Sequence, residues 1–191
     1  MAACSIALLV PSCGGSPHDD HARSTRSDDQ PVITGEPAGS NAADVAFANN
    51  ATTREEQGIK ISRLVADRSD NSELVTFAAK TASALQADTD VLKALRTQWK
   101  ESQDNQPGGG APSSPTGGLI DDATAAKLNS LHGTEFDTLW LQSMISLDQG
   151  TIDAANAEVA NGKNVDAVSL AKQIVKARQA DIGRMQQFLA G

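Results

Sequence analysis

The sequence predicts an all-α protein in which four long helices form an up-and-down bundle behind an N-terminal tail. Apolar residues recur at steps of three and four along four segments of roughly 25 residues, which is the spacing of amphipathic helices. The chain is rich in alanine, has no tyrosine and contains only 3% aromatic residues, which favours closely packed helices over a β-sandwich. No segment shows the alternation of apolar and polar residues that indicates a half-buried strand.

The first two helices are expected at residues 41–69 and 72–99, and either Asp70 or Ser72 is expected to cap the second. The core-facing positions of the first helix are Val45, Ala48, Thr52, Ile59, Ile61, Leu64 and Val65. Those of the second helix are Leu74, Phe77, Ala78, Thr81, Leu85, Leu92, Leu95 and Trp99. Because each set lies along one helix face, the two segments are expected to pack as a hairpin.

A second hairpin is expected after a linker at residues 103–120, whose glycines and prolines disfavour regular structure. A short helix is predicted at residues 121–133, followed by long helices at 134–162 and 164–191, and Gly162 is predicted to close the first of these two as a C′ residue. The core-facing positions of the two long helices are Phe136, Trp140, Met144, Leu147, Val168, Ala171, Ile174, Val175, Ile182, Met185, Phe188 and Leu189.

Residues 1–12 resemble the signal peptide of a bacterial lipoprotein, because a short apolar run ends in V-P-S-C at Cys13. Such signals are cleaved before the cysteine, which then carries the lipid. Residues 13–40 are polar and rich in Pro, Gly and Ser, as expected of a disordered tether. The alternative is that the apolar run is a buried strand or helix at the start of the fold. We prefer the lipoprotein interpretation, which predicts membrane attachment on the outer face of the bacterial cell membrane or in the periplasmic space.

Charge and cysteine content argue against several classes of function. A formal net charge of −8 without a basic cluster argues against nucleic-acid binding. With Cys4 in the signal peptide and Cys13 lipidated, no thiol would remain for catalysis or redox chemistry. The only histidine after the tether is His132, which leaves no basis for a Ser-His-Asp triad, and we attribute His18 and His21 in the tether to chance. We therefore expect neither enzymatic activity nor a cofactor.

The two halves of the predicted bundle, residues 41–102 and 121–191, look like copies of one helical hairpin. A Gln-Gly pair recurs in both halves, at Gln57-Gly58 and Gln149-Gly150. The chain resembles the bacterial domain-of-unknown-function 305 family through Asn41, Asp44, Val45, Phe47, Ala48, Trp99, Gly133, Phe136, Asp137, Trp140, Leu141, Met144, Ile145, Gly150, Leu170, Ala171, Ile174, Asp181, Ile182, Met185, Phe188 and Leu189. This resemblance implies a ferritin-like bundle of two hairpin repeats over residues 41–190.

In the family that this chain resembles, each repeat carries a methionine followed by a pair of histidines. Thioether and imidazole groups suit soft or borderline metals such as copper, so the resemblance implies metal handling for members with these residues. This chain lacks the histidines, and we interpret the corresponding positions as a vestigial metal site: Ala51, Arg54, Glu55, Met144, Leu147 and Asp148. Met144 is the only one of the family's ligands that remains, and we expect it to be a core residue.

Charged residues take the place of the missing ligands, and the fold implied by the resemblance brings five of them near one level of the bundle: Arg54, Glu55, Asp148, Arg178 and Asp181. One interpretation is an arginine–carboxylate network in place of the metal ligands. A second interpretation, which the sequence alone favours, is that the site is open to water and the charges are solvated. A third is a hard-cation site of the three acids with Glu56 or Asp153, which the neighbouring arginines oppose.

From these observations we expect a non-enzymatic lipoprotein of the cell envelope whose bundle is an interaction or structural module. Its expected partners are the membrane, through the lipid anchor, and a protein that the sequence does not identify. Formation of a homo-oligomer is left open. The alternative is a copper-type metal-binding protein of the envelope that acts through the remaining carboxylates and Met144.

Overall fold

The computed structural model describes residues 39–103 and 117–191, and every regular element in these ranges is a helix. All of these residues belong to one compact unit, residues 31–191. The expected signal peptide, Cys13 and the tether up to residue 38 lie outside the described residues. Within the described ranges, no helix combines the length and apolar character needed to cross a membrane.

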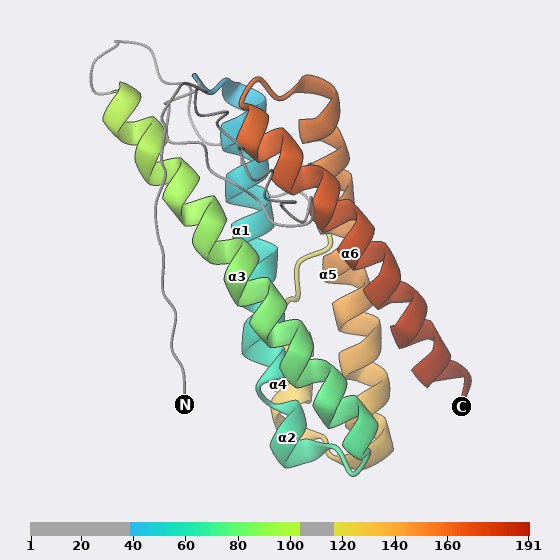
Figure 1. The fold of residues 1–191 in the computed structure, drawn as a ribbon. Coiled ribbons are helices and arrows are strands. Elements are labelled where there is room, and N and C mark those ends of the chain that lie inside the picture. The colour runs from blue at the N-terminus through green and yellow to red at the C-terminus, as the bar shows by residue number, and fades with distance from the viewer. Residues whose placement is uncertain (1–38, 104–116) are drawn as a thin grey trace, which may run out of the picture. The chain divides into compact units, whose positions relative to one another are not determined.

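The predicted all-α, up-and-down bundle is confirmed, and its long helices lie side by side in Figure 1. These helices are α1 (Ala42–Ser62), α3 (Ser72–Gln103), α5 (Gly133–Asn161) and α6 (Val165–Ala190). Two short helices lie near one end of the bundle, α2 (Val65–Arg68) and α4 (Asp122–Ser130). Helix α1 packs extensively against both α3 and α5, and α5 packs against α6, whereas α3 and α6 contact each other over a smaller region.

The start of α1 is fixed by a carboxylate that also holds the turn between α5 and α6. The Asn41 side chain accepts hydrogen bonds from the backbone of Ala43 and Asp44, and the Asp44 carboxylate accepts one from the Asn41 backbone, which together form a capping box. The same carboxylate accepts hydrogen bonds from the backbone N–H groups of Lys163, at 3.0 Å, and Asn164, at 2.9 Å. Asp44 therefore connects the first and second hairpins at this end of the bundle.

Two local features differ from the sequence prediction. The cap of α3 is Asn71, not Asp70 or Ser72, because its side chain accepts hydrogen bonds from the backbone of Glu73 and Leu74. The expected first helix is interrupted after Ser62 by a turn before α2, although the residues in this turn keep nearly helical dihedral angles. Gly162 ends α5 as expected, but it is the C-cap residue with an extended backbone and not the C′ residue that was predicted.

The buried apolar residues form two clusters, one toward each end of the bundle. The cluster nearer α2 and α4 contains Ile59, Ile61, Val65, Leu74, Ala78, Leu85, Leu128, Phe136, Trp140, Leu141, Met144, Leu147 and Met185. The other contains Phe47, Ala48, Ala51, Leu92, Leu95, Trp99, Ala155, Ala167, Leu170, Ala171 and Ile174. Along each long helix, the residues between these two clusters include buried polar side chains, so a polar layer separates the two halves of the core.

Candidate functional site

Each long helix contributes a fully buried polar side chain to the layer between the two apolar clusters. These side chains are Glu55 on α1, Thr89 on α3, Asp148 on α5 and Arg178 on α6, each no more than 2% exposed. Each lies four residues after an apolar core residue of its own helix, so the helix periodicity directs it inward; these core residues are Ala51, Leu85, Met144 and Ile174. Burying charged side chains in this way is costly in free energy unless they are paired, so each of them is expected to have a partner of opposite charge or a hydrogen-bond partner.

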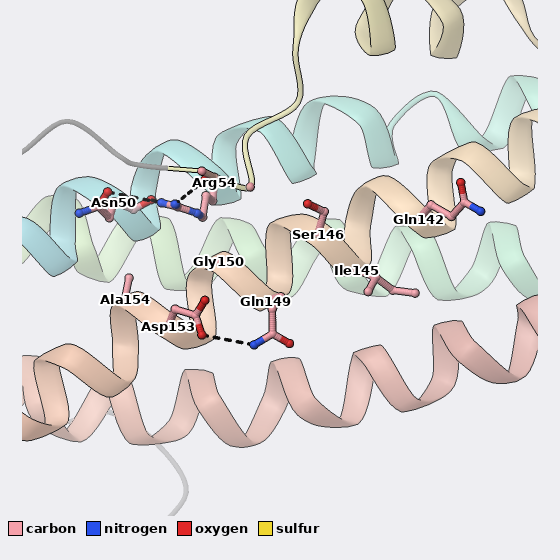
Figure 2. A pocket seen from close by; sticks show the side chains of 11 residues that line it. Asn50, Arg54, Gln142, Ile145, Ser146, Gln149, Gly150, Asp153 and Ala154 are labelled. Carbon is pink, nitrogen blue, oxygen red and sulfur yellow. Dashed lines mark hydrogen bonds between the residues drawn. The ribbon is translucent and has the colours of Figure 1, made fainter.

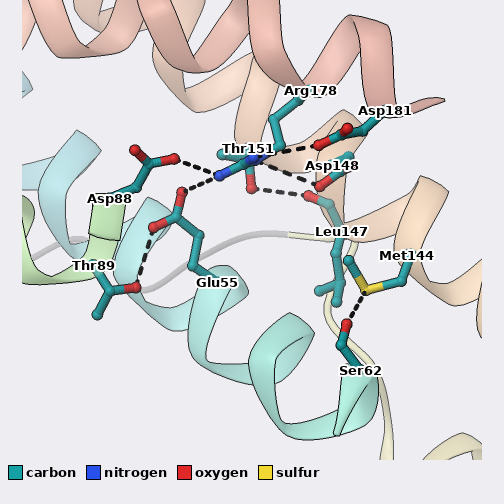
Figure 3. Close-up of polar contacts among 10 residues, drawn as sticks. All are labelled: Glu55, Ser62, Asp88, Thr89, Met144, Leu147, Asp148, Thr151, Arg178 and Asp181. Carbon is teal, nitrogen blue, oxygen red and sulfur yellow. Dashed lines mark hydrogen bonds and ion pairs between the residues drawn. The ribbon is translucent and has the colours of Figure 1, made fainter. Parts of the chain in front are cut away.

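Arg178 is the centre of this layer and pairs with a carboxylate from every long helix (Figure 3). Its Nη2 atom lies 2.5 Å from Asp88 and 3.3 Å from Glu55. Its Nε atom lies 3.7 Å from Asp148, and its Nη1 atom lies 3.5 Å from Asp181 on the same helix. One guanidinium therefore links α1, α3, α5 and α6 at a single level of the bundle.

Two threonines complete the polar layer. The Thr89 hydroxyl donates a hydrogen bond to Glu55 Oε2 at 3.2 Å, so both oxygens of the Glu55 carboxyl have a partner. The Thr151 hydroxyl donates to the backbone carbonyl of Leu147 one turn earlier, at 3.0 Å. Asp88 and Asp181 lie at the edge of the layer, where their side chains are about one quarter exposed. The layer is thus closed toward α1 and α5 and reaches solvent beside α3 and α6.

Burial changes the ionisation of the acidic groups in the polar layer, which also holds more acid than base. Burial raises the pKa of Glu55 to about 8 and that of Asp148 to about 7, although the nearby guanidinium opposes both shifts. Burial also raises the pKa of Asp88 and of Asp181, again against the effect of Arg178. Burial alone would lower the pKa of Arg178, but the surrounding carboxylates raise it. The arginine therefore stays charged, and part of the acid around it stays protonated at neutral pH.

The structure brings together four of the five residues that the sequence grouped at this level: Glu55, Asp148, Arg178 and Asp181. The solvated interpretation that the sequence favoured is wrong for Glu55, Asp148 and Arg178, since all three are buried. Neither Glu56 nor Asp153 joins them. Glu56 pairs with Lys93 on the surface, and Asp153 accepts a hydrogen bond from Gln149.

The grouping of Arg54 with this layer is wrong. Its guanidinium donates hydrogen bonds to the backbone carbonyls of Asn50, at 3.2 Å, and Gly117, at 2.8 Å, in a separate pocket of about 670 Å³ between α1 and α5 (Figure 2). Consecutive helical residues point about 100° apart, and on α1 this offset directs Glu55 toward Arg178 and Arg54 toward the separate pocket. Gly150 on α5 allows this placement, because a Cβ there would lie 2.5 Å from Arg54 Nε.

Asp88 is a member of the site that was not predicted from the sequence, although its spacing from the apolar residues of α3 indicates a position facing the core. It lies three residues after Leu85 and four before Leu92, both of which are buried core residues of α3. A charged residue on this stripe is expected to face the interior or its edge. Thr89 follows it directly and is fully buried.

The remaining vestigial positions are part of the apolar core. Ala51 and Leu147 are at most 1% exposed and belong to the two core clusters. Met144 is fully buried, and its sulfur accepts a hydrogen bond from the Ser62 hydroxyl at 3.8 Å. In the part of the chain that the structure describes, no three His, Cys, Asp or Glu side chains are arranged to hold a metal ion. In their present arrangement, the side chains of the described residues therefore do not form a copper site.

Comparison of the sequence with models of protein families shows which family the chain belongs to. The sequence model of the family Domain of unknown function (DUF305) matches residues 44–189, which include nearly the whole of the four long helices and all of the polar layer. The chain belongs to the DUF305 family. The predicted membership is thus confirmed. No curated protein matches the sequence of this DUF305 chain.

Solved structures of similar proteins share the fold of this DUF305 domain. A DUF305 protein of Streptomyces coelicolor, assigned as secreted, is 23% identical with a TM-score of 0.67, over 78% of this chain and 91% of that one. A DUF305 fragment from Deinococcus radiodurans is 20% identical with a TM-score of 0.68, over 80% of this chain and 98% of that one. CopM in its Cu(I)-bound form is 18% identical with a TM-score of 0.60, over 76% and 94% of the two chains.

Proposed function

We propose that this DUF305 protein is an exported, non-enzymatic protein of the cell envelope whose bundle serves as an interaction or structural module. The observation that carries this proposal is Arg178, which is fully buried and paired with carboxylates from every long helix. Its guanidinium supplies the positive charge at the level where the resemblance to the family placed metal ligands. A cation that belongs to the chain is present in every molecule, so the fold would not depend on metal supply.

The absence of metal dependence is tested by titrating Cu(I) into the full chain carrying Cys4→Ala, Cys13→Ala, His18→Ala and His21→Ala, which removes the thiols and histidines of residues 1–40 as competing ligands. We expect no stoichiometric binding in the micromolar range and no rise in the melting temperature, because the described interior offers two thioethers, Met144 and Met185, and no imidazole. Calorimetry and thermal unfolding provide the two measurements. Stoichiometric binding that stabilises the fold would reverse the proposal.

A metal-handling function is the second candidate, because the fold is similar to CopM, whose structure has been solved in Cu(I)-bound and Cu(II)-bound forms. In this chain the available ligands would be the sulfur of Met144 and the nearby carboxylates of the polar layer. Met144 is already surrounded by core residues, and each carboxylate pairs with Arg178. Copper binding would therefore require these side chains to leave their present partners, whereas the structural proposal requires no rearrangement.

Attachment to the membrane through Cys13 is a further part of the proposal, and it rests on the sequence alone. Replacing Cys13 by alanine is expected to move the protein from the membrane fraction to the soluble fraction, or to leave an unprocessed precursor. The physical reason is that the two or three acyl chains of a bacterial lipoprotein hold it firmly in the bilayer, which no single chain would do. Fractionation of cells that produce each form makes the comparison. Unchanged membrane association of the variant would contradict lipid anchoring at Cys13.

A further inference from the structure

The carboxyl groups of the polar layer are related by the internal repeat of the fold. Glu55 and Asp148 are separated by the same number of positions as Asp88 and Asp181, 93 in each pair, counted from 55 to 148 and from 88 to 181. The first residues of α3 and α6, Ser72 and Val165, have the same separation. The helix caps Asn71 and Asn164 share it as well. The four acids are therefore two repeat-related pairs.

The cation at the centre does not follow the repeat. Arg178 corresponds under the same separation to Leu85, a buried core residue of α3. Each long helix thus supplies one carboxyl group, and only α6 also supplies a positive charge. The acids form two repeat-related pairs, and the arginine is an addition to one half of the repeat.

The guanidinium does not form hydrogen bonds with all of the acidic groups around it. Among the described residues, Arg178 Nε and Nη1 make no hydrogen bond, since their carboxylate neighbours lie at 3.7 and 3.5 Å. Asp148 is 2% exposed and points toward Arg178 in Figure 3, yet its Oδ2 atom has no hydrogen-bond partner there. One positive charge faces four acidic groups, so Arg178 alone does not neutralise all of them when they are ionised.

We propose that Glu55, Asp88, Asp148 and Asp181 form a cation-binding cage whose present occupant is the Arg178 side chain, and that the cage accepts a hydrated divalent cation once this side chain is removed. The inference rests on the proposed function, in which Arg178 takes the place of a metal ion. All four donors are carboxylates, which selects Mg²⁺, Mn²⁺ or Ca²⁺ over copper.

The geometry indicates that such an ion would keep part of its water shell. The carboxylates stand around the three nitrogens of a guanidinium and not around one point. In the described part of the chain they do not converge closely enough to coordinate an ion directly. Water molecules would span the difference, as they commonly do for Mg²⁺ and at many Ca²⁺ sites.

The test is the full chain carrying Arg178→Ala, titrated with Mn²⁺ and followed by calorimetry, electron paramagnetic resonance and thermal unfolding. We expect one ion per chain with a dissociation constant on the order of 10⁻⁴ M, the range of extracellular calcium modules. We also expect the melting temperature to rise with Mn²⁺ concentration. The wild-type chain should show neither effect, because its own arginine occupies the cage.

The matched control adds Glu55→Gln and Asp148→Asn to Arg178→Ala, which removes two cage carboxylates and leaves the acidic tail unchanged. Binding lost in this control supports the cage, whereas equal Mn²⁺ binding by both variants would assign the ion to another place and overturn the proposal. If Arg178→Ala is unfolded without metal, circular dichroism shows whether Mn²⁺ restores the helices, as metal-coupled folding requires. A variant that stays unfolded with Mn²⁺, or is folded without binding it, overturns the cage. These Mn²⁺ experiments on variants say nothing about Cu(I) binding to a chain that keeps Arg178. The Cu(I) titration therefore tests the proposed function separately.

Discussion

Replacing Arg178 by methionine is expected to lower the free energy of unfolding by about 3–5 kcal/mol near neutral pH, the usual cost of removing one partner from a buried ion pair. Methionine preserves much of the side-chain length, so the loss comes mainly from the missing charge. Without the guanidinium, Glu55 and Asp148 remain buried with no cation beside them. Chemical denaturation of the variant and the wild-type chain measures the difference.

Arg184→Met is the matched control on the same helix. Arg184 pairs with Glu73, but both side chains are largely exposed, so we expect this change to cost less than about 1 kcal/mol. Combining Arg178→Met with Asp148→Asn should cost less than the sum of the two single changes, with an interaction energy of roughly 0.5–3 kcal/mol. A cost for Arg178→Met as small as that of Arg184→Met would show that the polar layer contributes little to the fold.

Stability is expected to fall as the pH rises from about 4.5 to about 8. The pKa of Glu55 rises from its ordinary 4.5 to about 8 in the folded chain, and that of Asp148 from 3.8 to about 7. Within this window the folded state keeps protons that the unfolded state has released, so raising the pH favours unfolding. Each retained proton contributes a slope of about 1.4 kcal/mol per pH unit. Below the ordinary pKa values both states are protonated, and these two groups add no further change.

Denaturant unfolding at several pH values measures this slope, and Glu55→Gln is the variant that isolates its source. Glutamine cannot titrate, so the slope should become shallower by the contribution of about one proton. Glu158 contributes in the same direction in both proteins, because burial and the adjacent Asp44 raise its pKa to about 8. A slope that Glu55→Gln leaves unchanged would mean that the polar layer does not hold the protons.

Most of the fold could be predicted from the sequence, because the spacing of apolar residues is a local signal. The apolar stripe that contains Trp140, Met144 and Leu147 identifies the buried face of α5 even when the helices that pack against it are not known. The interruption of the first helix after Ser62 was missed because the turn contains neither glycine nor proline. The cap of α3 was missed because three neighbouring residues, Asp70, Asn71 and Ser72, are all suitable caps.

The polar layer was harder to predict, because its pairing depends on contacts between distant helices. The resemblance to the family placed Glu55, Asp148, Arg178 and Asp181 near one level, but the sequence favoured solvated charges, since isolated buried charges are rare. Arg54 was misplaced because adjacent family positions were treated as one unit, although the helix directs them to different pockets. Asp88 was overlooked because it lies at the edge of an apolar stripe and outside the family positions considered.

A crystal structure of this chain grown or soaked with Ag⁺, with anomalous scattering used to locate the metal, shows whether Arg178 or a soft metal ion occupies the bundle interior. We expect no silver site in the bundle interior, and we expect Arg178 to stay within hydrogen-bonding or ion-pair distance of Glu55, Asp88, Asp148 and Asp181, as in the metal-free protein. A silver ion bound to the sulfur of Met144 together with these carboxylates, and an Arg178 side chain displaced from the polar layer, would contradict this expectation.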